Sequence, residues 1–300
     1  MTNAWIQRFL SLGSLLLGWG LAAWLWNTHR TAALWCLALP ALITPTILAI
    51  DCVWAAQANR NDPAPRATFL QWLAAWFAEC RIAAKVFTWW QPFRHHAIAD
   101  QLHSSPGQRG MVLVHGFFCN RALWTEWMGK LTTEGRVFVS VDLEPAFGSI
   151  SDYAAIVEQA IAKVEKATGM PPVIVGHSMG GLAIRAWAAQ FASSAQQLAR
   201  VHRIFTLGTP HQGTAIAQLS HTENGHQMRM KSPWLISNAS QLPDGFAQIC
   251  TCYFSNCDNI VFPCHTAALP GADNRFIAGR AHVELINVQE IQQECMAALK

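Results

Sequence analysis

The sequence predicts an α/β fold, a mostly parallel sheet with helices on both faces, preceded by a pair of membrane-spanning helices. From residue 106 to residue 300, short apolar segments alternate with helical ones, as is typical of parallel sheets buried on both faces. Two long uncharged runs stand in tandem near the start of the chain. We therefore expect a helical hairpin over residues 1–58, a linker and amphipathic helix over 59–105, and one α/β domain over 106–300.

The composition agrees with a membrane attachment. Hydrophobic residues make up 52% of the 300 residues and charged residues 13%, against about 25% charged in ordinary soluble domains. Ten of the fourteen tryptophans precede residue 91, so the apolar excess is concentrated in the first third of the chain. The net charge of +3 gives no indication of a nucleic-acid partner.

The hairpin is predicted from two apolar runs. Residues 9–26 form an uncharged run of 18 residues, which spans about 27 Å as a helix and so matches the core of a bilayer. Residues 32–50 form a second run, of 19 residues, interrupted by Pro40 and Pro45. Indole rings favour the membrane interface, and several tryptophans lie near the ends of the runs: Trp5, Trp24, Trp26, Trp35 and Trp54.

A cleaved signal peptide is the main alternative to a retained anchor. Only Arg8 precedes the first run, and no small-x-small cleavage site follows Trp26, so we expect the anchor to be retained. Arg8, Arg60 and Arg66 flank the outer ends of the hairpin, whereas Arg30 lies in its turn. This asymmetry places both outer ends, and with them the α/β domain, in the cytoplasm.

An amphipathic helix is predicted over residues 67–90. Apolar side chains recur there at steps of three and four, whereas Gln71, Glu79 and Lys85 are polar. Such a helix either lies in the membrane interface or packs on the α/β domain, and the periodicity does not distinguish the two.

The α/β domain is predicted to contain six strands and three long helices. The strands are expected at 111–114, 136–142, 172–176, 203–207, 249–254 and 274–278, and the helices at 150–167, 179–191 and 286–299. Residues 213–247 show no strand pattern and hold several apolar side chains, so we expect a cap or lid there, over the ends of the strands.

The strongest motif is Gly176-His177-Ser178-Met179-Gly180, which directly follows a strand and opens a helix. This strand–turn–helix context is the one in which Gly-x-Ser-x-Gly exposes a nucleophilic serine, because the tight turn lifts the hydroxyl out of the sheet. The alternative is a purely structural turn. A second motif, His115-Gly116-Phe117-Phe118, also follows a strand. The N–H groups of Phe117 and Met179 are then the expected oxyanion donors, and His115 is expected to be structural.

A nucleophilic serine needs a base and an orienting acid, in the chain order Ser, Asp, His for this type of fold. His282 lies between the last strand and the last helix and is the predicted base. Asp258 follows the strand 249–254 and is the predicted acid. The alternatives are His265, His211, His221 and His226 for the base, and Asp273 and Asp244 for the acid.

The chain has nine cysteines and no Cys-x-x-Cys pair. Cys250, Cys252, Cys257 and Cys264 are close together in the sequence, but their irregular spacing matches no zinc pattern. We expect mostly buried, reduced thiols and no metal, with a single disulfide as the alternative.

Together these motifs, with Gly208-Thr209-Pro210-His211-Gln212-Gly213-Thr214, resemble the α/β-hydrolase superfamily over residues 110–300, and more narrowly the bacterial triacylglycerol lipases and related lipid esterases. The resemblance implies an α/β-hydrolase fold, no cofactor, and a lipid or other lipophilic ester as substrate. With the hairpin, it implies a protein of the bacterial inner membrane. Substrate contacts are expected from Phe118, His177 and Trp124, with core packing as the alternative for the aromatic residues. An acyltransferase and a non-catalytic binding protein are the alternative functions.

Overall fold

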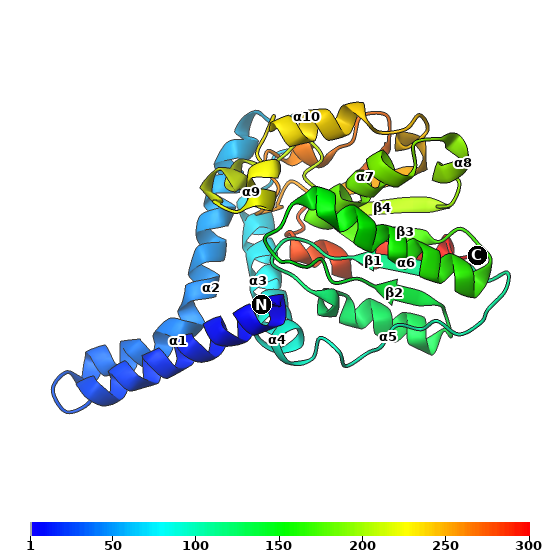
Figure 1. Cartoon of the computed structure of the whole chain (residues 1–300). Helices are drawn as coiled ribbons and strands as arrows, with labels where there is room; N and C mark the ends of the chain where they lie inside the picture. Colours follow the sequence, from blue (N-terminus) through cyan, green and yellow to red (C-terminus); the bar gives the residue numbers. More distant parts are fainter. Residues whose placement is uncertain (1) are drawn as a thin grey trace.

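The computed structural model describes residues 2–300 and contains one parallel sheet, with strand order β2-β1-β3-β4-β5-β6 (Figure 1). All neighbouring strands pair in parallel. Their carboxyl ends therefore meet at one edge of the sheet, where open α/β sheets bind their ligands. The strands are β1 (Met111–Val114), β2 (Phe138–Ser140), β3 (Val173–His177), β4 (Arg203–Leu207), β5 (Cys250–Phe254) and β6 (Asp273–Phe276).

Alternating side chains of the strands build a core on each face of the sheet. Val112 and Val114 of β1 belong to the core with α6 (Tyr153–Thr168) and α7 (Met179–Phe191). Met111 and Leu113 belong to the opposite core, with α5 (Thr125–Thr133) and α11 (Gln289–Ala297). Because side chains along a strand alternate between faces, each apolar strand is buried on both sides.

The α/β-hydrolase fold predicted from the sequence is confirmed. Strands β1 and β4 have the predicted bounds, whereas β2 is shorter than predicted, and α7 spans the predicted residues. Between β4 and β5 the chain forms only short helices, including α9 (Glu223–Gln227) and α10 (Pro233–Ser240). This insertion is the segment expected to form a cap.

Two apolar helices, α1 (Asn3–Leu25) and α2 (Arg30–Ala58), pack against each other, and their connected ends project away from the α/β domain (Figure 1). Their approach is close, because a β-carbon at Gly18 would lie 2.7 Å from the Cys36 carbonyl oxygen. Both are long and apolar enough to cross a membrane, and most of their surface is exposed, which suggests membrane association. Helix α2 continues eight residues beyond the apolar run that ends at residue 50. The second half of α2 runs back beside α3 (Phe69–Lys85) (Figure 1).

Helix α3 (Phe69–Lys85) packs on the α/β domain, which is one of the two arrangements considered for the amphipathic segment. It begins with a capping box between Thr68 and Gln71 and continues into a π-helical turn (Val86–Trp90) and α4 (Gln91–Phe93). Its buried face packs on the α/β domain, with Ile82 in the core beneath β1. Its other face leaves Phe69, Leu70, Leu73 and Phe77 exposed.

This packing predicts unequal effects of truncating the two faces of α3. Ile82→Ala should lower the free energy of unfolding by about 2–4 kcal/mol, because it leaves a cavity in the core. Leu70→Ala, on the exposed face, should change it by less than about 0.5 kcal/mol. Chemical unfolding of the full chain in detergent micelles measures both, and equal effects would contradict the packing of α3 on the domain.

Candidate active site

Ser178 stands on a strained turn at the carboxyl end of β3. Its backbone has φ 55° and ψ −130°, a left-handed conformation that residues with side chains rarely adopt. The turn is held from both sides, since the Ser178 N–H donates to the Leu207 carbonyl at 2.8 Å and the Gly181 N–H donates to the Ser178 carbonyl at 3.0 Å. This is the strained geometry expected of a nucleophile elbow.

Two glycines allow other chain segments to approach this turn. A β-carbon at Gly180 would lie 2.6 Å from the His115 carbonyl oxygen, so the start of α7 can pack against the end of β1 only without a side chain. A β-carbon at Gly116 would lie 2.7 Å from the β-carbon of Ser178 and 3.3 Å from its hydroxyl oxygen. The loop after β1 therefore lies directly against Ser178.

Asp258 and His282 form a buried pair at the same edge of the sheet. The Nδ1 atom of His282 lies 2.9 Å from Oδ2 of Asp258, and the two residues are 4% and 1% exposed. The other carboxylate oxygen of Asp258 accepts N–H groups from Ile260 at 2.9 Å and Val261 at 2.7 Å. These hydrogen bonds hold the carboxylate in place, and the carboxylate in turn orients the His282 ring through Nδ1. The other ring nitrogen, Nε2, does not contact Asp258.

The charges around His282 favour its protonated form. Burial alone lowers the pKa of His282, but the adjacent Asp258 carboxylate, with a further contribution from Glu79, outweighs burial and raises the pKa above its usual value. The neighbouring His177 has a ring centroid 4.6 Å from that of His282, and its Nε2 lies 3.1 Å from the His282 carbonyl oxygen. Burial holds the pKa of His177 well below its usual value, so this ring is neutral and supports His282 without adding charge.

The predicted oxyanion donors lie on the two segments that meet at Ser178. Within residues 2–300, neither the Phe117 nor the Met179 N–H donates to an acceptor in the protein. His115 braces the first segment, because its Nδ1 lies 2.9 Å from the Gly116 carbonyl oxygen and its Nε2 accepts the Leu143 N–H at 2.9 Å. These contacts agree with the structural role expected for His115.

A largely apolar cavity of about 340 Å³ opens beside Ser178. It lies between Ser178, the loop after β1 and the insertion after β4. An apolar cavity next to a reactive group is the usual form of a small-molecule site. Its lining residues are Phe117, Ser178, Pro210, Thr214, Ile216, Ala217, Leu219, Ser220, Gly225, Met228, Ile260 and Val261.

The three predicted substrate contacts do not line this cavity. Trp124 is fully buried in the core against Trp127, with ring centroids 5.2 Å apart, so the core alternative applies to it. Phe118 stacks on Phe147, and His177 lies behind His282 as described above. The better candidates for substrate contact are the apolar residues of the insertion, which the sequence did not single out individually.

The alternative acids and bases have other partners or are exposed. His265 pairs with Asp62 at 2.7 Å, and the ring of His211 lies 3.0 Å from the Thr206 hydroxyl. Asp273 pairs with Arg275 at 2.7 Å at the start of β6, and Asp244 is exposed. The structure therefore brings together the pair that the chain order favoured.

Polar residues of the amino-terminal segments form hydrogen bonds with the loops of the site. The sequence did not predict this role. The Gln7 side-chain amide donates to the Phe118 carbonyl at 2.8 Å, and Asn3 donates to the carbonyl of Cys119. Asn59, at the end of α2, accepts the Cys264 N–H at 2.9 Å. Glu79 on α3 accepts N–H groups of the segment after His282. The only signal in the sequence is that these polar residues interrupt apolar helices.

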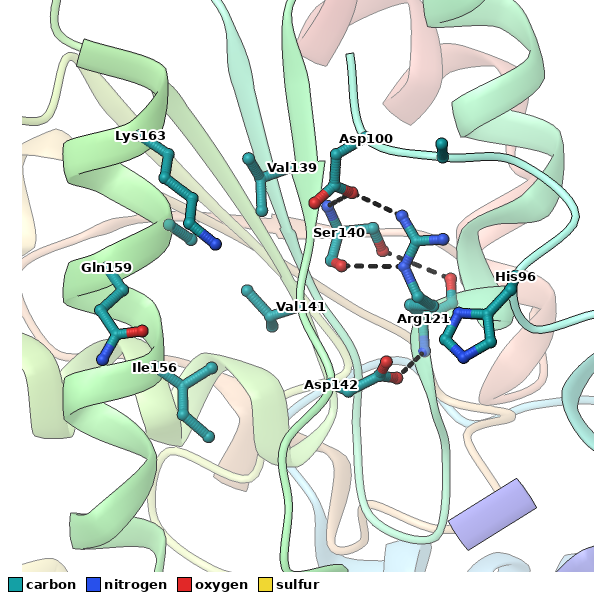
Figure 2. A pocket seen from close by; sticks show the side chains of 12 residues that line it. His96, Asp100, Arg121, Val139, Ser140, Val141, Asp142, Ile156, Gln159 and Lys163 are labelled. Carbon is teal, nitrogen blue, oxygen red and sulfur yellow. Dashed lines mark hydrogen bonds and ion pairs between the residues drawn. The ribbon is translucent and has the colours of Figure 1, made fainter. Parts of the chain in front are cut away.

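A second cavity, of about 430 Å³, lies beside β2 and contains none of the predicted site residues (Figure 2). Arg121 spans one side of it, with Nη2 on Asp100 and Nε on the Ser140 carbonyl at 3.2 Å. Lys163 and Gln159 of α6 face this network across the cavity (Figure 2). These contacts of Arg121 hold the segment that follows the loop after β1 against β2, which is a structural role.

All nine cysteines are free thiols in the structure. Within residues 2–300, no group of three or more His, Cys, Asp or Glu side chains is arranged to hold a metal ion.

Comparison with known proteins places the chain in a family. Residues 111–273 match the model of the alpha/beta hydrolase family, so the chain belongs to that family and is a hydrolase by membership. No curated protein matches the sequence significantly. Solved structures with a similar fold include the mature form of the lipase BlEst2 from Bacillus licheniformis, at 17% identity and a TM-score of 0.53, covering 66% of this chain and 94% of that one.

Two further solved structures resemble this chain. The propeptide form of BlEst2 gives 18% identity and a TM-score of 0.53, covering 66% of this chain and 51% of that one. A monoacylglycerol lipase from Paleococcus ferrophilus gives 13% identity and a TM-score of 0.46, covering 65% and 97%. At these identities, the BlEst2 structures show a shared fold and nothing more specific.

The close approach of Gly116 to Ser178 predicts a selective loss of activity. Gly116→Ala should lower the hydrolysis rate of a short p-nitrophenyl ester by about tenfold or more, because the new methyl group displaces the Ser178 side chain or the oxyanion loop. Gly129→Ala is the matched control, since nothing lies within 4 Å of its β-carbon position. Equal rates for the two variants would show that the loop does not pack on Ser178 as described.

Proposed function

We propose that this hydrolase is a membrane-anchored serine carboxylic-ester hydrolase that acts on acyl lipids or other lipophilic esters through an acyl-enzyme. The observation that carries the proposal is the buried Asp258–His282 pair, at the same sheet edge as the strained Ser178. A fixed acid–base pair beside a serine held in a strained turn is the arrangement that activates a hydroxyl nucleophile.

In the proposed reaction, Nε2 of His282 accepts the Ser178 hydroxyl proton while the serine oxygen attacks the ester carbonyl carbon. The N–H groups of Phe117 and Met179 stabilise the negative charge that develops on the carbonyl oxygen. The tetrahedral intermediate collapses, the protonated His282 donates its proton to the departing alkoxide, and the alcohol leaves. Water, deprotonated by His282, then attacks the acyl-enzyme. The second tetrahedral intermediate collapses, and His282 returns its proton to the Ser178 oxygen as the carboxylic acid leaves.

The cavity beside Ser178 supports an apolar acyl group as the part of the substrate that the enzyme holds. Its walls include Ile216, Leu219, Met228 and Val261, and it contains no charged side chain. Burial of a hydrocarbon chain there contributes about 0.8 kcal/mol for each methylene group removed from water. A lipophilic ester therefore gains binding energy from a region remote from the bond that is cleaved.

The apolar surface of the amino-terminal helices supports membrane anchoring. Helices α1 and α2 expose large apolar side chains along their length, and α3 adds an exposed apolar face close to the α/β domain. A hairpin that crosses the bilayer would hold the domain against the lipid surface, which is the source of lipophilic substrates. We propose the bacterial inner membrane, which the resemblance to bacterial lipases and the hairpin imply. The arginine asymmetry supports a cytoplasmic location of the α/β domain.

The nucleophile is tested by substitution. Ser178→Ala should reduce kcat for a p-nitrophenyl ester by about 10³-fold or more with KM little changed, since it removes the attacking oxygen and leaves the cavity intact. Ser193→Ala, at an exposed position, is the control and should retain wild-type rates. Wild-type rates in Ser178→Ala would refute the serine mechanism.

The anchor is tested by extraction of membranes that contain the full-length protein. An integral hairpin should stay in the membrane pellet after washing with alkaline carbonate and should enter solution only with detergent. Release by carbonate would show that the helices lie on the membrane surface and do not cross it.

A further inference from the structure

Glu79 is a carboxylate buried where α3 meets the α/β domain, only 2% exposed. Among residues 2–300, no lysine or arginine forms an ion pair with it. Its two oxygens instead accept the Val283 N–H, both at 3.0 Å, and Oε2 also accepts the Glu284 N–H at 3.2 Å. These two N–H groups belong to the residues immediately after His282.

A buried carboxylate is costly unless it is paired or hydrogen-bonded, because burial disfavours its charge. Burial raises the pKa of Glu79 to about 7, with Asp258 adding to the increase, whereas His282 and the Val283 N–H act in the opposite direction. The charges of Glu79 and His282 therefore influence each other.

We propose that Glu79 is a positioning residue for catalysis: from the amino-terminal helix α3, it holds the main chain that carries His282 and supplies a second negative charge to that base. The proposal rests on the proposed function, since it concerns the base of that reaction. Its consequence is that α3 belongs to the active site as well as to the membrane attachment.

The surroundings leave Glu79 as the principal charge, apart from Asp258, that acts on His282. The side chain of Glu284 turns away to Arg280, at 2.7 Å. Burial raises the pKa of the nearby Cys119 thiol to about 12, so that thiol carries no charge at neutral pH. The groups that face Glu79 or His282 from the elements packed on them are Asp258, His177, Cys52, Cys80 and Cys119.

The test compares pH profiles of kcat/KM for full-length variants in detergent micelles, with a soluble p-nitrophenyl ester as substrate. Glu79→Gln keeps one acceptor oxygen and removes the charge, so the pKa of His282 falls and its neutral form persists to lower pH. The acidic limb should move to lower pH by about half a unit or more. Glu79→Ala also leaves two N–H groups without an acceptor, so kcat above the acidic limb should fall by about tenfold or more, and Glu79→Gln should restore part of that loss.

Glu126→Gln is the matched control, because Glu126 is a surface carboxylate of α5 that also contacts α3, through Lys85. It should leave both the acidic limb and kcat unchanged. An acidic limb in Glu79→Gln that coincides with that of the wild type would overturn the proposal, as would an equal shift in Glu126→Gln.

Two further variants separate this proposal from folding defects and from the proposed function. Glu79→Asp retains the charge, so its acidic limb should stay with that of the wild type even where kcat falls. If Glu79→Gln does not fold, a shifted limb in Glu79→Asp overturns the proposal. Ser178→Ala distinguishes failure of this proposal from failure of the proposed function. If Ser178→Ala is inactive and the acidic limb of Glu79→Gln does not move, only the role of Glu79 is rejected. If Ser178→Ala retains activity, the serine mechanism itself is rejected.

Discussion

The buried contact between Asp258 and His282 is the interaction on which the proposed site depends. It exists because β5 and β6 are parallel neighbours, so the loops that follow them meet at one edge of the sheet. Gly208, at the end of β4, makes room for it, since a β-carbon there would lie 2.9 Å from the Asp258 carboxylate. The same parallel order brings the turn after β3, with Ser178, to this edge.

The amino-terminal helices contribute contacts to this edge of the sheet. Gln7 of α1 contacts the oxyanion loop, Asn59 at the end of α2 holds the loop after Asp258, and Glu79 of α3 holds the segment after His282. Three of the four loops that carry proposed catalytic groups, all but the turn with Ser178, are thus bonded to a segment more than 100 residues away in the sequence. This architecture couples the geometry of the site to the position of the helices.

The sequence predicted the fold and the order of the proposed triad because both depend on local patterns. Strand β1 is a continuous apolar run, β4 is mostly apolar, and the turn at Ser178 has its own motif. Contacts between distant segments have no such pattern: nothing in the sequence around Glu79 indicates that it meets Val283. Trp124 fails as a predicted substrate contact for the same reason, since an aromatic residue near a loop packs into the core or lines a cavity according to elements that lie elsewhere in the chain.

The central claim is that Ser178 is a nucleophile activated by His282 and Asp258. Its most direct test is to treat the full-length protein with a fluorophosphonate, which labels activated serines covalently, and to locate the adduct by peptide mass spectrometry. We expect one adduct per chain, on the peptide containing Ser178, and much slower labelling in His282→Ala. No adduct on Ser178, or labelling that is as fast without His282, would contradict it.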